Sequence, residues 1–269
     1  MLIPIALMVI GGDDCCASMK VFAKDPGFRA EHLAPEKISF TPQHGSVGTL
    51  DYGAGKAPVF IVPPARKARA AVIVIHEWWG LNDYIKREAE RLHKDTGYGV
   101  VAIDLYGGKV ATTSEEAGKL IQTVDDAVAK AIVMAAPEQI KTGTLFGRKL
   151  DKVGTLGWCF GGGWSFQTAL LGGDKVDACA LYYGMPETDP VKLRDLKAPV
   201  LGIFGNQDQR LNAALVGKFA EGMAGAARPL ELRVYAAGHA FANPSNPKYD
   251  KKNAEDAWQA TLVFFKRYL

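Results

Sequence analysis

Short runs of β-branched and aliphatic residues alternate with helix-length segments along most of this sequence, and no other feature constrains the fold as strongly. Six runs, each bounded by Gly, Pro or Asp, are predicted to be strands: residues 71–75, 99–103, 153–156, 178–182, 200–204 and 230–235. Four helix-length stretches lie among them: residues 83–94, 114–135, 162–171 and 212–223. Strands that alternate with helices predict an α/β fold, with a mainly parallel sheet and helices on both of its faces.

Two further regions complete the predicted architecture. Residues 254–268 place apolar side chains at i, i+3 and i+4, which is typical of a helix that docks one face on the core. Residues 37–41 and 58–62 flank a glycine-rich turn region, and we expect them to add an antiparallel N-terminal edge to the sheet. The sequence therefore predicts one domain over residues 36–269, preceded by a leader or surface arm over residues 1–35.

The composition and the N-terminal residues exclude several classes of protein. The 32 Lys and Arg against 29 Asp and Glu give a net charge of +3, and the positive residues are scattered, which argues against nucleic-acid binding. The apolar run at residues 2–10 is too short to be a stable membrane span. Export, with a periplasmic location or a lipid anchor near Cys15 and Cys16, and a cytoplasmic location both remain open. Four cysteines in 269 residues do not indicate a disulfide scaffold.

The strongest local motif is a strand that runs into G-x-C-x-G and then into a helix, within residues 153–163. This is the nucleophile-elbow pattern, with Cys159 in the position that serine often occupies. Such a turn presents the side chain to a ligand, and Gly157 and Gly161 leave room for neighbouring backbone. The helix N-terminus favours a thiolate, and the backbone N–H of Phe160 is a candidate oxyanion donor. A buried structural cysteine before a glycine-rich helix is the alternative interpretation.

A base and an acid that orients it follow in the expected order. Asp208 comes after the strand at 200–204 and His239 after the strand at 230–235, so both are expected at carboxyl ends of strands, where sites of α/β proteins gather. Acyl transfer by a weak nucleophile needs such a base and such an acid. The chain order Cys159, Asp208, His239 is the order nucleophile, acid, histidine of α/β-hydrolases.

Glu77 is a second acidic residue of interest, because it follows the apolar strand at 71–75. A carboxylate is costly to bury, so Glu77 is either an ion-pair member in a solvated loop or a group that tunes the protonation of Cys159. The backbone N–H of Trp78 is a candidate second oxyanion donor. The neighbouring Trp79 is a candidate pocket wall, with core packing as the alternative.

As a set, these motifs resemble the dienelactone hydrolase family of α/β-hydrolases, over roughly residues 36–269. The resemblance rests on His76-Glu77-Trp78-Trp79-Gly80, Asp104-Leu105-Tyr106-Gly107, Gly157-Trp158-Cys159-Phe160-Gly161-Gly162, Tyr182-Tyr183-Gly184, Gly205-Asn206-Gln207-Asp208 and Gly238-His239-Ala240-Phe241. It implies an α/β-hydrolase fold and a hydrolase of carboxylic esters or lactones.

The resemblance also implies a role for each candidate residue. The thiol of Cys159 is expected to rest neutral against Glu77, which takes its proton when substrate binds. His239 and Asp208 stabilise the thiolate, and His239 then activates water for deacylation. The implied backbone oxyanion donors are Phe160 and Trp78, and the implied pocket residues are Trp79, Tyr106, Tyr183 and Phe241.

Two positions depart from the family pattern. Its best-known members hold the substrate's carboxylate with two arginines, and the matching positions here are Gly108 and Asn243. Neither residue offers the planar cationic fork that binds a carboxylate. We therefore expect a general ester or lactone hydrolase with a neutral substrate, or one in which Lys109 substitutes as a point charge.

Two alternatives remain open at this stage: a non-catalytic ligand-binding protein on a hydrolase fold, and a thiol redox protein, although the sequence contains no C-x-x-C. No metal or organic cofactor is expected, because Gly80 stands where H-E-x-x-H requires its second histidine. The remaining histidines, which lack a partner pattern and are expected to be surface or structural, are His32, His44, His76 and His93. We expect a small-molecule substrate, a monomer or small homo-oligomer, and pocket-rim loops at residues 107–116 and 242–249.

Overall fold

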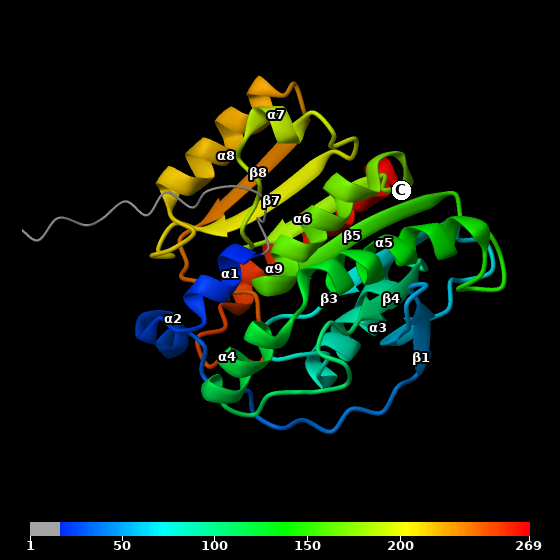
Figure 1. The fold of residues 1–269 in the computed structure, drawn as a ribbon, viewed down its shortest axis with the longest axis horizontal. Coiled ribbons are helices and arrows are strands. Elements are labelled where there is room, and N and C mark those ends of the chain that lie inside the picture. The colour runs from blue at the N-terminus through cyan, green and yellow to red at the C-terminus, as the bar shows by residue number, and fades with distance from the viewer. Residues whose placement is uncertain (1–16) are drawn as a thin grey trace, which may run out of the picture.

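The computed structural model describes residues 17–269, which form one eight-stranded sheet in the order β1-β2-β4-β3-β5-β6-β7-β8 (Figure 1). The strands are β1 (Ser46–Asp51), β2 (Lys56–Val62), β3 (Ala70–Ile75), β4 (Gly99–Ile103), β5 (Lys152–Trp158), β6 (Ala178–Tyr182), β7 (Val200–Gly205) and β8 (Leu230–Tyr235). The helices are α1 (Ala17–Phe22), α2 (Pro26–Glu31), α3 (Asp83–Thr96), α4 (Ser114–Thr123), α5 (Asp126–Thr142), α6 (Phe160–Gly172), α7 (Pro190–Leu193), α8 (Ala213–Gly225) and α9 (Lys251–Tyr268), with a 3₁₀ turn at Gly173–Lys175. The predictions for residues 2–10 and for Cys15 and Cys16 lie outside the described residues.

The sheet is parallel from β4 to β8, while β1 and β2 pair antiparallel at one edge. Every residue of β3, β4, β6 and β7 is buried, which is why these strands read as continuous apolar runs rather than as alternating ones. The α/β fold and the antiparallel N-terminal edge are therefore confirmed.

Helices cover both faces of the sheet, as predicted. On β5, a Cβ at Gly154 would meet Phe265 of α9, whereas a Cβ at Gly157 would meet Gly161 of α6. Because residues three apart on a strand point to opposite faces, α9 and α6 lie on opposite sides of the sheet. Helix α3 packs on α9, and α5 packs on α6 (Figure 1). Within residues 17–269, no helix combines the length and the apolar character needed to cross a membrane.

The strand predicted at residues 37–41 is wrong, because β2 pairs instead with Ser46–Asp51. The tight turn between the two strands explains the choice: Asp51 accepts a hydrogen bond from the N–H of Gly53 at 2.8 Å, and the N–H of Tyr52 donates to Gly55 at 3.0 Å. A turn of this kind pairs the residues that flank it directly. The antiparallel edge is therefore correct, but its outer strand lies further along the chain.

The single helix predicted over residues 114–135 is also wrong, because the chain forms α4 and α5 with a break at Val124. The side chain of Asp125 accepts hydrogen bonds from the N–H groups of Ala127 and Val128 at 2.9 and 3.0 Å. Asp125 is thus the N-cap of α5, and capping by a short acidic side chain competes with a continuous helix.

The N-terminal arm, defined here as residues 20–34, packs against the domain, and Figure 1 shows α1 beside α4. Lys20 pairs with Asp126 at 2.7 Å and donates to the carbonyl of Val124 at 2.6 Å. Phe28 of α2 is fully buried. The arm therefore contributes to the core, although the motifs read in the sequence begin after it.

The parallel strands β3, β5, β6, β7 and β8 are consecutive neighbours, so their carboxyl ends meet at one edge of the sheet. The residues that leave these ends include Glu77, Cys159, Tyr183, Asp208 and His239. This edge is where ligands bind in open α/β sheets, and it positions the candidate site.

Candidate active site

Cys159 occupies a strained turn between β5 and α6. Its backbone has φ 54° and ψ −118°, which a residue with a side chain adopts only when its surroundings enforce it. Two backbone hydrogen bonds support the turn: the N–H of Cys159 donates to Tyr182 at 3.0 Å, and the N–H of Gly163 donates to the Cys159 carbonyl at 3.2 Å. The side chain is fully buried at the edge of the sheet.

The glycines around Cys159 are required by close backbone contacts. A Cβ on Gly157 would stand 2.0 Å from the carbonyl oxygen of Gly161, and one on Gly161 would stand 2.1 Å from that of Ile75. Both separations are far shorter than any non-bonded carbon–oxygen contact. The G-x-C-x-G motif is therefore explained by the passage of α6 close to β3 and β5.

His239 and Asp208 form a buried hydrogen-bonded pair, with Nδ1 of His239 2.5 Å from Oδ2 of Asp208. The other oxygen of Asp208 accepts from the N–H groups of Arg210 and Leu211 at 2.9 and 3.0 Å. Burial acts to raise the pKa of Asp208, but the hydrogen bond and the charge of His239, together with the two backbone N–H groups, outweigh it and lower that pKa below its ordinary value. Asp208 is thus a carboxylate that fixes the orientation of His239.

The second ring nitrogen of His239 faces the sulfur of Cys159. The two atoms lie within 4.8 Å of each other, and Nε2 of His239 has no hydrogen-bond partner among residues 17–269. Burial raises the pKa of the Cys159 thiol, and the imidazole of His239 opposes that shift. Burial also disfavours the charged form of His239, but the Cys159 sulfur and Asp208 prevail and raise the pKa of His239 well above its ordinary value.

Glu77 is buried, so its interpretation as an ion-pair member in a solvated loop is wrong. Burial raises its pKa to about 7, although the charge of His239 and two hydrogen bonds act in the other direction. The hydroxyl of Tyr183 donates to Oε1 at 3.3 Å, and the amide of Asn243 donates to Oε2. The carboxylic acid therefore changes its charge near neutral pH, beside the other candidate residues.

The four predicted pocket residues are all buried, but they have different neighbours. The ring of Tyr183 lies 5.2 Å from that of His239 and 5.6 Å from that of Phe241. Tyr106 packs 5.6 Å from the ring of Phe160, and its hydroxyl has no partner among the described residues. Trp79 packs edge-on against Trp78 at 5.2 Å. Tyr183 and Phe241 thus adjoin His239, whereas Trp79 packs behind Trp78.

The predicted oxyanion donors, Phe160 and Trp78, belong to the start of α6 and to the loop after β3. Phe160 is the first residue of α6, so its N–H has no carbonyl of its own helix to pair with. This N–H also lowers the pKa of the Cys159 thiol. His76 fixes the β3 loop: its Nδ1 bonds the carbonyl of Glu77 at 2.5 Å, and its Nε2 accepts from the N–H of Leu105 at 3.0 Å. His76 is structural, as expected.

The positions that depart from the family pattern have defined roles in this structure. Asn243 is committed to Glu77 and, through its side-chain oxygen, to the N–H of Ser245 at 2.8 Å. Gly108 lies in an exposed turn with φ +88°, where its N–H donates to Asp104 at 2.6 Å. Lys109 is exposed.

His32 is the residue of this site that sequence reasoning missed. It belongs to the N-terminal arm, it is buried, and its Nε2 lies 3.5 Å from the sulfur of Cys159. Its ring packs 4.5 Å from that of Trp78 and 5.0 Å from that of His239. Burial lowers the pKa of His32 well below its ordinary value, and the charge of His239 lowers it further. The ligand atoms of His32, Cys159 and His239 lie within 4.8 Å of one another, close enough to share a metal ion.

The arm is held over the site by Arg210, which follows Asp208 in the chain. Its guanidinium pairs with Asp25 at 2.7 Å and with Glu31 at 3.0 Å, and it lies 5.5 Å from the ring of Phe28. Phe28 in turn packs edge-on against Trp78 at 5.3 Å. The arm thus encloses Cys159 from the solvent side.

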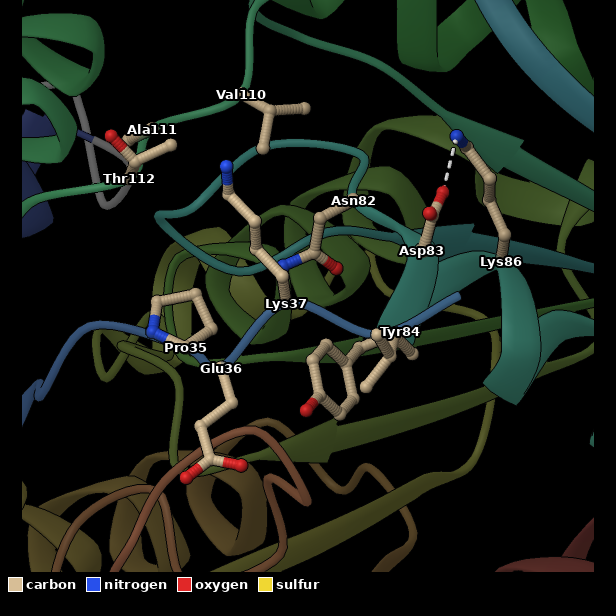
Figure 2. A pocket seen from close by; sticks show the side chains of 11 residues that line it. Pro35, Glu36, Lys37, Asn82, Asp83, Tyr84, Lys86, Val110, Ala111 and Thr112 are labelled. Atoms are coloured by element: carbon tan, nitrogen blue, oxygen red, sulfur yellow. Dashed lines mark hydrogen bonds and ion pairs between the residues drawn. The ribbon is translucent and has the colours of Figure 1, made fainter. Parts of the chain in front are cut away.

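Two surface hollows lie near this edge of the sheet, and neither is lined by Cys159. The first, of about 440 Å³, is lined partly by Glu31, Gly238 and His239. The second, of about 420 Å³, lies between residues 35–38, the start of α3 and residues 110–112, and Figure 2 shows Asp83 and Lys86 paired beside it. The first hollow therefore reaches the candidate base, whereas the second contains none of the predicted site residues.

Comparison with known proteins adds independent information. The model of the dienelactone hydrolase family matches residues 58–269. Protein usf of Aquifex pyrophilus is 34% identical over 210 residues, which cover 74% of this chain and 88% of the relative. A protein of Aquifex aeolicus named "Putative carboxymethylenebutenolidase" is 31% identical over 211 residues, covering 75% and 90%. The structure of a dienelactone hydrolase-like promiscuous phosphotriesterase from metagenomic libraries is similar in fold, with a TM-score of 0.72 and 21% identity over 83% of this chain and 98% of that one.

Proposed function

Because the chain belongs to the dienelactone hydrolase family, within the α/β-hydrolase superfamily, and is a lactone or ester hydrolase, we propose that Cys159 is its nucleophile and that Asp208 and His239 complete a catalytic triad. One observation carries the proposal. The sulfur of Cys159, presented by a strained turn, lies within 4.8 Å of a ring nitrogen of His239 whose opposite nitrogen is bonded to Asp208. A nucleophile, a base and an orienting acid in this order perform acyl transfer.

In the first step, the sulfur of Cys159 attacks the carbonyl carbon of the substrate. The thiol proton passes to Glu77, whose pKa of about 7 makes its carboxylate a competent base near neutral pH. The thiolate is stabilised by the imidazolium form of His239, which Asp208 supports. The carbon–oxygen bond of the ester or lactone then breaks, the alkoxide takes up the proton on Nε2 of His239, and a thioester of Cys159 remains.

In the second step, water attacks the thioester. Nε2 of His239 removes a proton from the water, and its Nδ1 stays hydrogen-bonded to Asp208, which stabilises the positive charge that forms on the ring. The carbon–sulfur bond breaks, the carboxylic acid leaves, and Glu77 returns its proton to the sulfur of Cys159. In both steps the negative oxygen is placed between the backbone N–H groups of Phe160 and Trp78.

We propose an uncharged ester or lactone as the substrate. Two features support a neutral acyl group: Asn243 is committed to Glu77, and Gly108 has no side chain to offer. Aromatic side chains pack around the neighbours of Cys159: the rings of Phe28 and Trp78 lie 4.1 and 4.5 Å from that of His32, and the ring of Tyr106 lies 5.6 Å from that of Phe160. Aromatic walls bury an apolar substrate without supplying a partner for a carboxylate.

The decisive experiment measures hydrolysis of short-chain aryl esters and simple lactones before and after alkylation of the protein with iodoacetamide. We expect activity to disappear as an adduct forms on Cys159. A saturating concentration of lactone is expected to slow the loss of activity and the formation of the adduct equally. Cys179→Ser is the matched control, because Cys179 is equally buried, in the middle of β6, and its sulfur bonds only structural partners such as Ser165 at 3.7 Å. The control is expected to keep its activity and its sensitivity to alkylation.

The alternatives give different results in the same assay. A ligand-binding protein shows no turnover of any ester, and its binding survives Cys159→Ala. A thiol redox protein loses its redox activity with Cys159→Ser, whereas a hydrolase retains weak esterase activity with the serine hydroxyl as nucleophile. Absence of turnover together with an inert Cys159 would overturn the proposed function.

A further inference from the structure

We propose that His32, Cys159 and His239 form a binding site for a thiophilic divalent cation, with Zn²⁺ as the best match, and that the bound ion fastens the N-terminal arm over the nucleophile and inhibits the enzyme. Binding rests on the three side chains alone. Inhibition rests also on the proposed function, in which Cys159 is the nucleophile. The site is distinct from the catalytic arrangement because His32, a residue of the arm, supplies one of its ligands.

The distances between the ligand atoms suit a tetrahedral zinc ion. Zinc–nitrogen bonds of about 2.0 Å and zinc–sulfur bonds of about 2.3 Å at a tetrahedral angle place a nitrogen and a sulfur ligand about 3.5 Å apart. Nε2 of His32 already lies 3.5 Å from the sulfur of Cys159. All separations, including those to Nε2 of His239, are within 4.8 Å, so side-chain movements of about 1 Å complete the arrangement.

Both imidazoles direct Nε2 toward the sulfur, because their other nitrogen is committed to an acceptor. Nδ1 of His32 lies 2.7 Å from the carbonyl oxygen of Phe28, which only accepts hydrogen bonds, so this nitrogen carries the proton. Nδ1 of His239 is bonded in the same way to the carboxylate of Asp208. Metal-binding histidines typically donate their second N–H to a carbonyl or a carboxylate, and both versions occur here.

An unsatisfied atom marks the centre of the cluster. Nε2 of His239 is buried, faces Cys159 and His32, and has no hydrogen-bond partner within residues 17–269. A buried polar atom without a partner costs about 1–3 kcal/mol. A bound cation removes this cost by taking Nε2 as a ligand.

The chemistry of the donors selects the cation. Two imidazoles and one thiolate match zinc, cobalt and other borderline or soft ions, whereas Mg²⁺ and Ca²⁺ prefer oxygen ligands. Binding replaces the proton on the sulfur of Cys159, and the proton on Nε2 of the imidazolium form of His239, by bonds to the metal. Both protons are released to solvent, with no change in oxidation state. Three protein ligands leave the fourth position for a water molecule.

The consequence for catalysis follows from the atoms that the ion occupies. The sulfur of Cys159 and Nε2 of His239 are both bound, so neither attack on a carbonyl nor activation of water takes place. His32 is held at the same time, which keeps the arm closed. The hollow of about 440 Å³ lined by Glu31, Gly238 and His239 brings solvent to one of the three ligand residues, His239.

The binding test titrates the full chain with Co²⁺ and records absorption, because a cobalt–thiolate bond gives a charge-transfer band in the near ultraviolet. We expect a band at one equivalent that Zn²⁺ displaces. His32→Ala is expected to weaken Co²⁺ affinity by at least about 100-fold, and Cys159→Ser to abolish the band. The controls His44→Ala, at an exposed position, and Cys179→Ser are expected to retain the full band. A band that is absent, or that His32→Ala leaves unchanged, overturns the site.

The activity test compares ester hydrolysis by each variant with and without Zn²⁺. We expect Zn²⁺ to inhibit the wild-type protein, a chelator to restore it, and the inhibitory concentration to rise at least about tenfold in His32→Ala relative to His44→Ala. Activation by Zn²⁺ overturns the inhibitory role. A cobalt band in a protein that hydrolyses no ester refutes the proposed function while supporting the metal site. Ester hydrolysis without a cobalt band refutes the metal site and leaves the proposed function standing.

Discussion

Replacing Arg210 by alanine is expected to open the site and to raise the catalytic efficiency. Cys159 is fully buried beneath the N-terminal arm, so a substrate reaches it only when the arm moves. The guanidinium of Arg210 holds the arm through Asp25 and Glu31 and contacts the ring of Phe28. Removing it leaves the packing of the arm as its main attachment near the site.

The size of the effect follows from these contacts. The side chain of Arg210 is only 13% exposed, but Asp25 is 43% exposed, so the two ion pairs are worth less than buried ones. We estimate that these ion pairs and the contact with Phe28 together stabilise the closed arm by about 2 kcal/mol. This free energy corresponds to about a 30-fold change in the ratio of closed to open protein. Apparent substrate affinity scales with the open fraction. kcat/KM is therefore expected to rise by up to about 30-fold, mainly through a lower KM.

Steady-state kinetics on a neutral aryl ester measure the change in kcat/KM. The rate of Cys159 alkylation measures the opening of the arm independently of catalysis. Arg267→Ala is the matched control: it also removes an arginine in an ion pair, with Glu231 at 2.5 Å, but on the exposed surface of α9. If a folded Arg210→Ala protein reacts with ester and with iodoacetamide no faster than the control, the arm is not what limits access to Cys159.

Three further predictions concern the site itself. Glu77→Gln is expected to lower kcat/KM by about 10²–10⁴-fold and to abolish the rise of activity through pH 7 that titration of Glu77 gives the wild-type protein, as a pH–rate profile will reveal. The raised pKa of Glu77 also means that the folded protein binds an extra proton between pH 4.5 and about 7. The free energy of unfolding therefore falls as pH rises through this window, by about 3 kcal/mol in total. Denaturant unfolding at pH 5 and pH 8 measures this fall, which should be absent in Glu77→Gln. Asp208→Asn is expected to reduce kcat by about 10⁴-fold through the wrong tautomer of His239, with little change in KM, as steady-state kinetics will measure. A large rise in KM with little change in kcat would argue against an orienting role. Gly161→Ala is expected to destabilise the fold by about 3 kcal/mol or more, since its Cβ meets the Ile75 carbonyl at 2.1 Å; an unchanged melting temperature would contradict the account of the motif.

The fold was predictable because its strands are buried on both faces. Fully buried strands such as β3 and β7 appear in the sequence as unbroken apolar runs, and their parallel arrangement places the residues that follow them at one edge. That geometry is sufficient to bring Cys159, Asp208 and His239 together from sequence positions far apart. The outer strand β1 was not predictable in the same way, because its residues are mostly exposed and its pairing is decided by the turn at Asp51.

His32 could not be predicted, for a different physical reason. His32 directly follows α2, which has six residues, too few for apolar periodicity to be read, and it lies 127 residues before Cys159 in the chain. Its place depends on Arg210 and on the packing of Phe28 against Trp78, which are contacts between distant segments that leave no local pattern. The only available signal was a cluster of an aromatic residue, a histidine and two acids within a segment that otherwise resembled a leader.

The N-terminal arm and Asp208 are held by the same turn, and this links access to Cys159 with the orientation of His239. Oδ1 of Asp208 accepts the backbone N–H of Arg210, while the side chain of Arg210 binds the arm. Oδ2 of Asp208 meanwhile fixes His239. The backbone N–H and the side chain of Arg210 therefore join the Asp208 carboxylate to the arm. Because that carboxylate also holds the orientation of His239, the closed arm and the position of Nε2 beside Cys159 depend on one short segment after β7. A change in the backbone of this segment should alter access and the orientation of His239 together, whereas loss of the Arg210 side chain alone should alter access.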